Sequence, residues 1–79
     1  MEINVAIQVA AIFRQGKIIP RWFIWENRKY FVTTVNYIWD DSEGRETVHY
    51  FAVTDNVNNY ELAFHSRQLT WTIEKLYST

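Results

Sequence analysis

The chain has 79 residues, a formal net charge of −1 and no cysteine. This length supports one core, so we predict one domain over residues 1–79. The charge excludes a strongly basic nucleic-acid binder, and the lack of cysteine excludes a disulfide framework, a thiol nucleophile and a thiolate metal site. A content of 48% hydrophobic and 18% aromatic residues is typical of a folded globular protein.

The charges are unevenly distributed along the chain. Residues 14–29 carry five basic side chains and one acidic one, whereas residues 40–61 carry six acidic side chains and one basic one. A basic pole of this kind can serve an anionic partner, or the two poles can meet head to tail. Glu2 stands where a signal peptide needs basic residues, and no stretch is apolar enough to span a bilayer. We therefore expect a soluble cytoplasmic protein without a membrane partner.

The first predicted element is a strand over residues 3–13, because apolar residues alternate there with period two. Gly16 is the expected left-handed residue of the turn that follows. Pro20 cannot donate a hydrogen bond to a strand ladder, so it indicates the start or the edge of a strand.

A β-hairpin is predicted next, with aromatic strands at residues 22–25 and 29–39 around a polar turn. The two-residue loop is either Glu26-Asn27 or Asn27-Arg28. Both registers place the same residues on each face of the hairpin. One face carries Phe23, Trp25, Tyr30 and Val32, and the other carries Trp22, Ile24, Lys29 and Phe31.

The apolar phase slips within residues 29–39, which indicates a bulge or a sharp bend near Thr33-Thr34. Residues 40–45 have the composition of an acidic turn. Further strands are predicted at residues 46–54, 60–65 and 70–77, with a helix from Leu69 as the alternative for the last. The expected fold class is all-β, a small curled six-stranded antiparallel barrel or meander.

The second face of the hairpin is the candidate binding site, because an antiparallel sheet usually has one polar face. We expect the bulky apolar side chains of this second face to be covered either by another part of the same chain or by a partner. The candidate residues are Arg21, Trp22, Ile24, Lys29 and Phe31. Tryptophan and arginine favour protein association, with a second copy or another protein. Basic residues interleaved with aromatic ones also suit weak single-stranded nucleic-acid binding, which is the alternative function.

No enzymatic chemistry is predicted. The serines lack a nucleophile motif, and the two isolated glycines form no phosphate-binding loop. If residues 55–59 form a five-residue loop, His49 lies opposite His65, close enough to share a metal ion. No third ligand is evident nearby, so we interpret the two histidines as a surface pair and predict no metal site and no cofactor.

The positions of the aromatic and apolar residues resemble those of a family of short bacterial proteins of uncharacterised function. The resemblance covers about residues 20–77 and includes Phe23-x-Trp25, Arg28-x-Tyr30-x-Val32, Trp39, Tyr60-Glu61-Leu62 and Trp71. The family usually has glycine before the arginine of the hairpin turn, where this chain has Asn27. The resemblance implies a fold and a bacterial source, and it supplies no catalytic residue.

Overall fold

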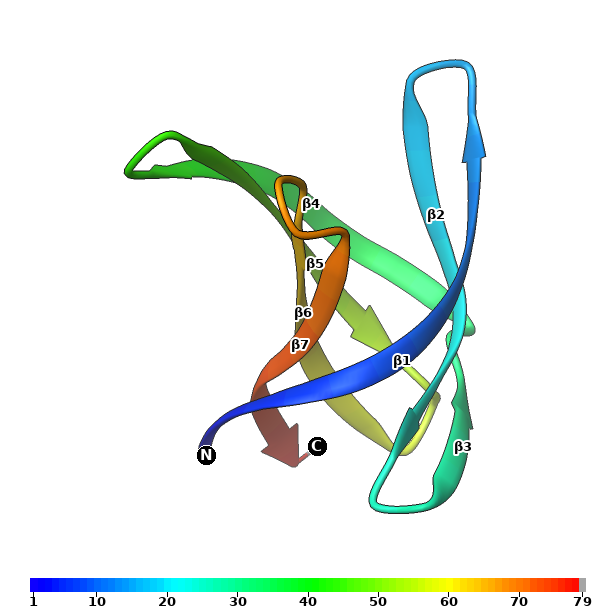
Figure 1. The fold of residues 1–79 in the computed structure, drawn as a ribbon. Helices are drawn as coiled ribbons and strands as arrows, with labels where there is room; N and C mark the ends of the chain where they lie inside the picture. Colours follow the sequence, from blue (N-terminus) through cyan, green and yellow to red (C-terminus); the bar gives the residue numbers. More distant parts are fainter. Residues whose placement is uncertain (79) are drawn as a thin grey trace.

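The protein is built entirely from strands and turns, which confirms the predicted fold class (Figure 1). The computed structural model describes residues 1–78, and no helix occurs among them. The seven strands are β1 (Glu2–Arg14), β2 (Lys17–Trp25), β3 (Arg28–Phe31), β4 (Thr34–Glu43), β5 (Glu46–Thr54), β6 (Asn58–His65) and β7 (Thr70–Ser78).

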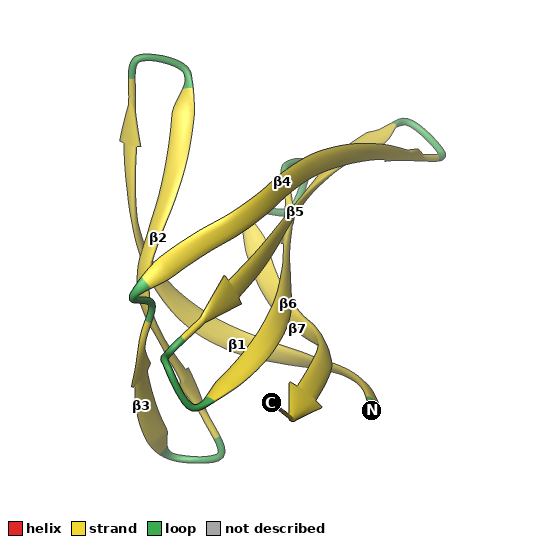
Figure 2. Cartoon of the chain, turned by 180° about the vertical axis from the view of Figure 1, so that it is seen from behind, coloured by secondary structure: helices red, strands yellow, loops and turns green. Residues whose placement is uncertain are grey.

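The strands form one antiparallel sheet in the order β3-β2-β1-β7-β6-β5-β4. The sheet is strongly curled but not closed, and β3 and β4 are its two border strands (Figure 2). These borders meet at a corner, residues 32–33, that joins β3 directly to β4. The backbone of this corner is hydrogen-bonded to both ends of the sheet. The Val32 N–H donates to the Arg21 carbonyl of β2, and the Thr33 N–H donates to the Thr54 carbonyl of β5, each at 2.9 Å.

The corner explains why the structure has seven strands and the prediction had six. The residues predicted as one strand over 29–39 are two strands that pair with different neighbours, β3 with β2 and β4 with β5. The phase slip near Thr33-Thr34 therefore marks a change of border, and a further bulge follows between Val35 and Tyr37.

The register of the hairpin follows from its turn. Phe23 pairs with Tyr30 and Trp25 with Arg28, so the loop is Glu26-Asn27. Both loop residues have positive φ, 54° and 62°, which is the type I′ geometry that matches the twist of the flanking strands. β2 itself begins at Lys17, earlier than predicted, and Pro20 is buried within it beside a bulge in the pairing with β1.

The core lies on the inner, concave face of the sheet. Phe23 is fully buried, stacked on Tyr30 and edge-on to Tyr60, with both ring centroids at 5.2 Å. The hairpin face predicted to point inward does so, because Trp25, Tyr30 and Val32 all pack against this core. The other buried core residues come from β5, β6 and β7 and are Phe51, Val53, Leu62, Phe64, Trp71 and Ile73.

The loop between β5 and β6 is tied to the corner. The Thr33 hydroxyl lies 3.0 Å from the Thr54 carbonyl and 3.1 Å from Asn56 Oδ1. Within the loop, Asp55 Oδ1 accepts from the N–H groups of Val57 and Asn58, each at 2.9 Å. Burial alone would raise the pKa of Asp55, but these hydrogen bonds outweigh it and hold the pKa below its usual value.

The C-terminal segment is a strand and not a helix, in agreement with the preferred prediction.

The acidic segment over residues 40–45 differs from the predicted turn. Residues predicted as a turn over 40–45 mostly continue β4, and only Gly44-Arg45 form the turn. Gly44 has a φ of +64°, a conformation that glycine adopts without strain.

Candidate interaction site

The outer face of the β2–β3 hairpin carries the predicted binding residues in two cross-strand rows. Trp22 pairs with Phe31, and Ile24 pairs with Lys29. The Phe31 side chain is 59% exposed, whereas Trp22 and Ile24 are half-buried. The face predicted to carry spare apolar groups therefore carries them, with its largest exposure at the border strand.

Lys29 lies across this face and covers part of it. Its Nζ is 4.1 Å from the centre of the Trp22 ring and 5.1 Å from that of Phe31. A cation over an aromatic ring is an attractive contact, so one ring face of Trp22 is already occupied. Phe31 keeps more of its surface in water.

The same surface continues over β1, as Ala10 pairs with Trp22. A hollow of about 440 Å³ opens here, and it brings Arg21 together with Trp22 and Phe31. Its full lining is Ala10, Ala11, Ile12, Arg21, Trp22, Phe31 and Val32. All five predicted site residues therefore lie on or beside one apolar surface with two cationic side chains.

A second apolar surface, which the sequence did not reveal, lies on β4. Tyr37, Ile38 and Trp39 are consecutive and are 73%, 61% and 40% exposed. Trp39 stacks on Tyr50 of β5 with ring planes 9° apart. The alternation of Val35, Tyr37 and Trp39 predicted a strand. The strand is exposed on both of its faces because it lies at the border of the sheet, and a border position depends on the order of the strands.

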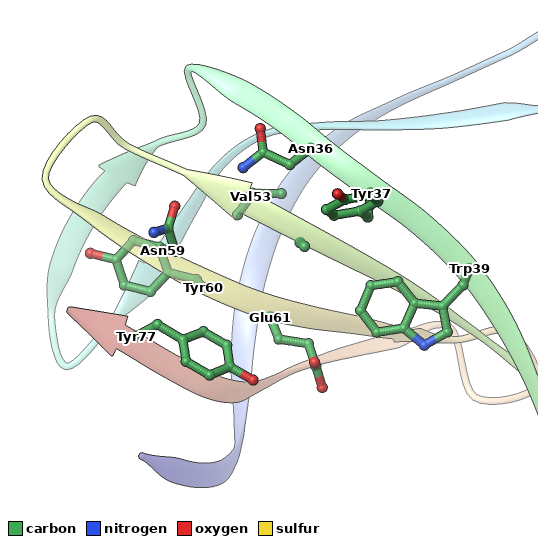
Figure 3. A pocket seen from close by; sticks show the side chains of 9 residues that line it. Asn36, Tyr37, Trp39, Val53, Asn59, Tyr60, Glu61 and Tyr77 are labelled. Atoms are coloured by element: carbon green, nitrogen blue, oxygen red, sulfur yellow. The ribbon is translucent and has the colours of Figure 1, made fainter. Parts of the chain in front are cut away.

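An aromatic hollow of about 570 Å³ adjoins this surface on the outer face of β4 to β7 (Figure 3). The rings of Trp39 and Tyr77 stand on either side of Glu61. Burial raises the pKa of Glu61, while the positive charge of Lys75, its partner on β7, acts in the opposite direction. The carboxylate of Glu61 in this hollow therefore already lies next to a positive charge of the same chain, that of Lys75.

The predicted pairing of the two histidines is wrong. Thr54 pairs with Asn59 and not with Tyr60, so the loop is one residue shorter and the register shifts by one. His49 faces Phe64 and His65 faces Val48. A shift of one residue moves a side chain to the other face of the sheet, which separates the two imidazoles.

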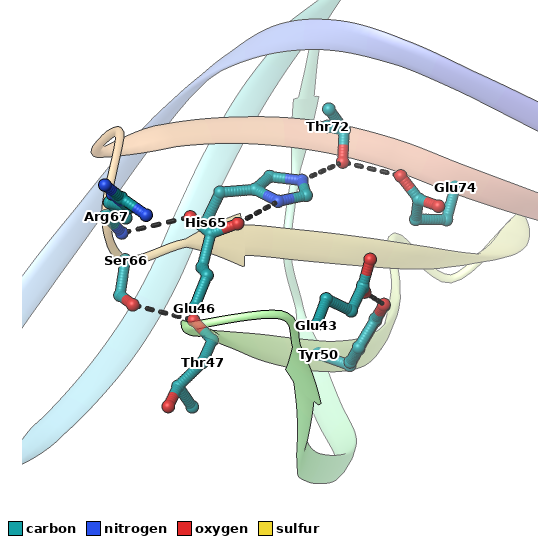
Figure 4. A network of polar contacts seen from close by, with 9 residues as sticks. All are labelled: Glu43, Glu46, Thr47, Tyr50, His65, Ser66, Arg67, Thr72 and Glu74. Carbon is teal, nitrogen blue, oxygen red and sulfur yellow. Dashed lines mark hydrogen bonds and ion pairs between the residues drawn. The ribbon is translucent and has the colours of Figure 1, made fainter.

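Each histidine has partners within the chain (Figure 4 shows those of His65). His49 Nδ1 lies 2.7 Å from Asp40 Oδ1. His65 Nε2 lies 3.0 Å from the Thr72 hydroxyl, and its Nδ1 lies 3.7 Å from Glu46 Oε2. No group of three or more potential metal ligands occurs within residues 1–78.

The other polar contacts near the β4–β5 turn are local. The Tyr50 hydroxyl donates to Glu43 Oε2 at 2.7 Å, and burial together with this carboxylate raises the pKa of Tyr50. The Ser66 hydroxyl donates to the Thr47 carbonyl and the Arg67 N–H to Glu46 (Figure 4). These contacts hold the β6–β7 turn against the start of β5.

In comparisons with known proteins, no family model, no curated protein and no solved structure matches this chain. The described part of the chain also contains no helix of the length and apolarity that crossing a membrane requires. The two exposed apolar surfaces, one at each border of the sheet, are the candidate interaction sites of this protein.

Proposed function

We propose that this protein is a non-catalytic interaction module that self-associates through the outer face of the β2–β3 hairpin. The observation that supports the proposal is the exposure of Phe31, 59%, beside Trp22 on a sheet face that no described segment covers. Burying one such aromatic side chain contributes about 1.5–3 kcal/mol, so a partner surface that covers it gains affinity.

The distribution of charge favours a second copy as the partner. Arg21 and Lys29 flank the hairpin face, whereas the β4–β5 arm of the same chain carries Asp40, Asp41 and Glu43. Two hairpin faces brought together would place like charges side by side. Contact between the hairpin face of one copy and the acidic arm of another is complementary in charge.

Sedimentation velocity over a wide range of concentrations tests this proposal with two matched variants. Phe31→Ser removes the exposed ring from the hairpin face. Leu69→Ser removes a side chain of comparable exposure, 74%, from the distant β6–β7 turn. We expect the dissociation constant to rise about tenfold or more in Phe31→Ser, equivalent to about 1.4 kcal/mol, and to stay unchanged in Leu69→Ser. A protein that associates equally well with Phe31→Ser contradicts the proposal.

A weak single-stranded nucleic-acid binder is the second candidate. The exposed ring of Phe31 lies next to two cationic side chains, Arg21 and Lys29, and bases stack on such rings while phosphates pair with the cations. Fluorescence anisotropy with a labelled oligothymidylate at about 50 and 200 mM salt tests it, since phosphate contacts weaken steeply with salt. Absence of binding at low salt removes this candidate.

A further inference from the structure

The β4 border of the sheet offers an open strand edge. β4 has ten residues and pairs with β5 on one side only. The other border strand, β3, has four residues, and the part of β2 beyond it contains Pro20. Short strands and prolines are devices that prevent a border from pairing with another chain, and β4 has neither. Its bulge is confined to the start of the strand, between Val35 and Tyr37, and its carboxylates at residues 40, 41 and 43 restrict which strand can pair with it.

The backbone groups that point away from β5 follow from the turn. Glu43 and Glu46 close a two-residue turn, so they form a hydrogen-bonded pair, and such pairs alternate along an antiparallel ladder. Counting back from Glu43, the residues whose N–H and C=O groups point outward are Ser42, Asp40 and Ile38.

One of these outward groups is already occupied. The Ser42 N–H donates to Asp41 Oδ1 at 2.9 Å, which agrees with its pointing away from β5. No strand within residues 1–78 pairs with Ile38 or Asp40 on the side away from β5, so their outward N–H and C=O groups have no ladder partner in the described sheet. The open part of the edge is therefore centred on Trp39.

We propose that β4 pairs antiparallel with β4 of a second copy about a two-fold axis at Trp39. In this register Ile38 of each copy lies opposite Asp40 of the other, so the outward groups of both residues find partners. Trp39 lies opposite Trp39 in a non-hydrogen-bonded pair, where side chains approach most closely. The new ladder covers the exposed side chains of Tyr37, Ile38 and Trp39 in both copies.

Charge selects this antiparallel arrangement. It sets Asp40 opposite Ile38 and Asp41 opposite Tyr37 of the second copy, so neither of these carboxylates faces another carboxylate. A parallel, in-register pairing would align all three carboxylates of β4 with their copies, and like charges directly opposite are destabilising.

The position of β2 adds to this complementarity. A cleft of about 370 Å³ separates β4 from the first half of β2, which pairs with β1 but not with β3. Lys17 lines this cleft together with Ile38 and Asp40. A strand that lies along the open edge of β4 enters this cleft, where its acidic residues meet the positive charge of Lys17. The positive charge of Lys17 on the β2 wall therefore favours an extended acidic segment, such as β4 of a second copy.

This contact goes beyond the proposed function, because it lies on the opposite border from the hairpin face and involves none of its residues. A protein that uses the β4 edge alone forms a closed dimer. Both contacts draw on the acidic residues of β4, so each arm engages either a hairpin face or a second β4 strand.

Disulfide trapping tests the register directly, since the chain has no cysteine of its own. Residues opposite each other in a non-hydrogen-bonded pair have Cα atoms about 4.5 Å apart, within the range that a disulfide spans. We expect Trp39→Cys to form a covalent dimer under mild oxidation. Tyr37→Cys, on the same strand and face, should not, because the two residues 37 lie about 13 Å apart along the ladder. Equal trapping of both variants, or of neither, overturns the proposal.

A second pair of variants tests the backbone contact without a thiol. Ile38→Pro removes only an N–H that points away from β5, a position where a border strand tolerates proline, and Ile38→Val keeps that N–H. In sedimentation experiments we expect Ile38→Pro to raise the dimer dissociation constant at least tenfold and Ile38→Val to leave it nearly unchanged. Unchanged dimerisation in a folded Ile38→Pro variant, or a wild-type protein that is monomeric throughout, overturns the proposal. Phe31→Ser should not affect the β4 dimer. The two variants, Phe31→Ser and Ile38→Pro, therefore test the hairpin contact and the β4 contact separately.

Discussion

The two borders of the sheet are made by consecutive strands, yet they differ in almost every respect. β3 is short, and its aromatic residues divide between Tyr30, which packs on the core, and Phe31, which is exposed. β4 is long, and all its residues from Tyr37 onward are exposed. The two-residue corner between them separates a border anchored by core packing from a border held mainly by its ladder with β5.

This difference shows how one aromatic-rich stretch can serve two purposes. In β2 and β3, the inward aromatic side chains stabilise the fold. In β4, Tyr37 and Trp39 lie on the outer face, so the fold depends on them much less. Their exposure at an open border suits contact with another molecule.

The largest expected effect contrasts a buried ring of the hairpin with an exposed ring of β4. Phe23→Ala removes a fully buried side chain that contacts Tyr30 and Tyr60, and should lower the free energy of unfolding by about 3–5 kcal/mol. Trp39→Ala removes a stacking contact with Tyr50 and should lower it by about 1 kcal/mol. Urea denaturation of the monomer measures both, and equal losses would contradict the contrast between the borders.

An intermediate effect is expected at the loop that ties the borders together. Asp55→Asn weakens the acceptor for the N–H groups of Val57 and Asn58 and for the Tyr60 hydroxyl, and should cost about 1–3 kcal/mol near neutral pH. Because folding lowers the pKa of Asp55, its contribution is complete above the pKa of the unfolded chain. It is lost as the pH falls through the lower pKa of the folded state.

Denaturation of Asp55→Asn between about pH 6 and pH 2 checks the sign of this effect. The wild type should lose more stability than the variant on acidification, so the two should converge at low pH. A difference in stability that stays constant across this range would show that the charge of Asp55 is not responsible.

The smallest expected effects concern two of the hairpin turns, β4–β5 and β2–β3. Gly44→Ala places a Cβ at a φ of +64° in the β4–β5 turn and should lower stability by about 1 kcal/mol, although open space surrounds the site. Glu26→Gly relieves the same kind of strain, at a φ of 54° in the β2–β3 turn, and should raise stability by about 0.5 kcal/mol. Thermal unfolding measures both, and a loss of stability in Glu26→Gly would contradict this reading of the turn.

The fold class, the last strand and the inward face of the hairpin could be predicted because each depends on local alternation or on turn chemistry. Phe23, Trp25 and Tyr30 keep the same parity in either loop register, so their common face did not depend on choosing between them. The positive φ of Asn27 likewise suits its residue type, because asparagine tolerates the left-handed conformation.

What could not be predicted depends on the partner that each strand takes. Residues 29–39 alternate well enough to resemble one strand, and only the paired neighbours show that Phe31 and Thr34 belong to opposite borders. The predicted pairing of His49 with His65 was wrong for a similar reason. When a loop is one residue shorter, every side chain of the following strand moves to the other face of the sheet relative to its partner strand. Border position, and with it the exposure of Trp39, is a property of the whole sheet.

The joint between β1 and β7 has a consequence for how the chain reaches this structure. All other ladders connect strands that follow each other along the sequence, whereas this one brings Glu2 beside Lys75. Joining such distant residues requires closure of a loop that spans nearly the whole polypeptide, and folding slows as such separations grow. We therefore expect the joining of β1 to β7 across the middle of the sheet to limit the overall folding rate.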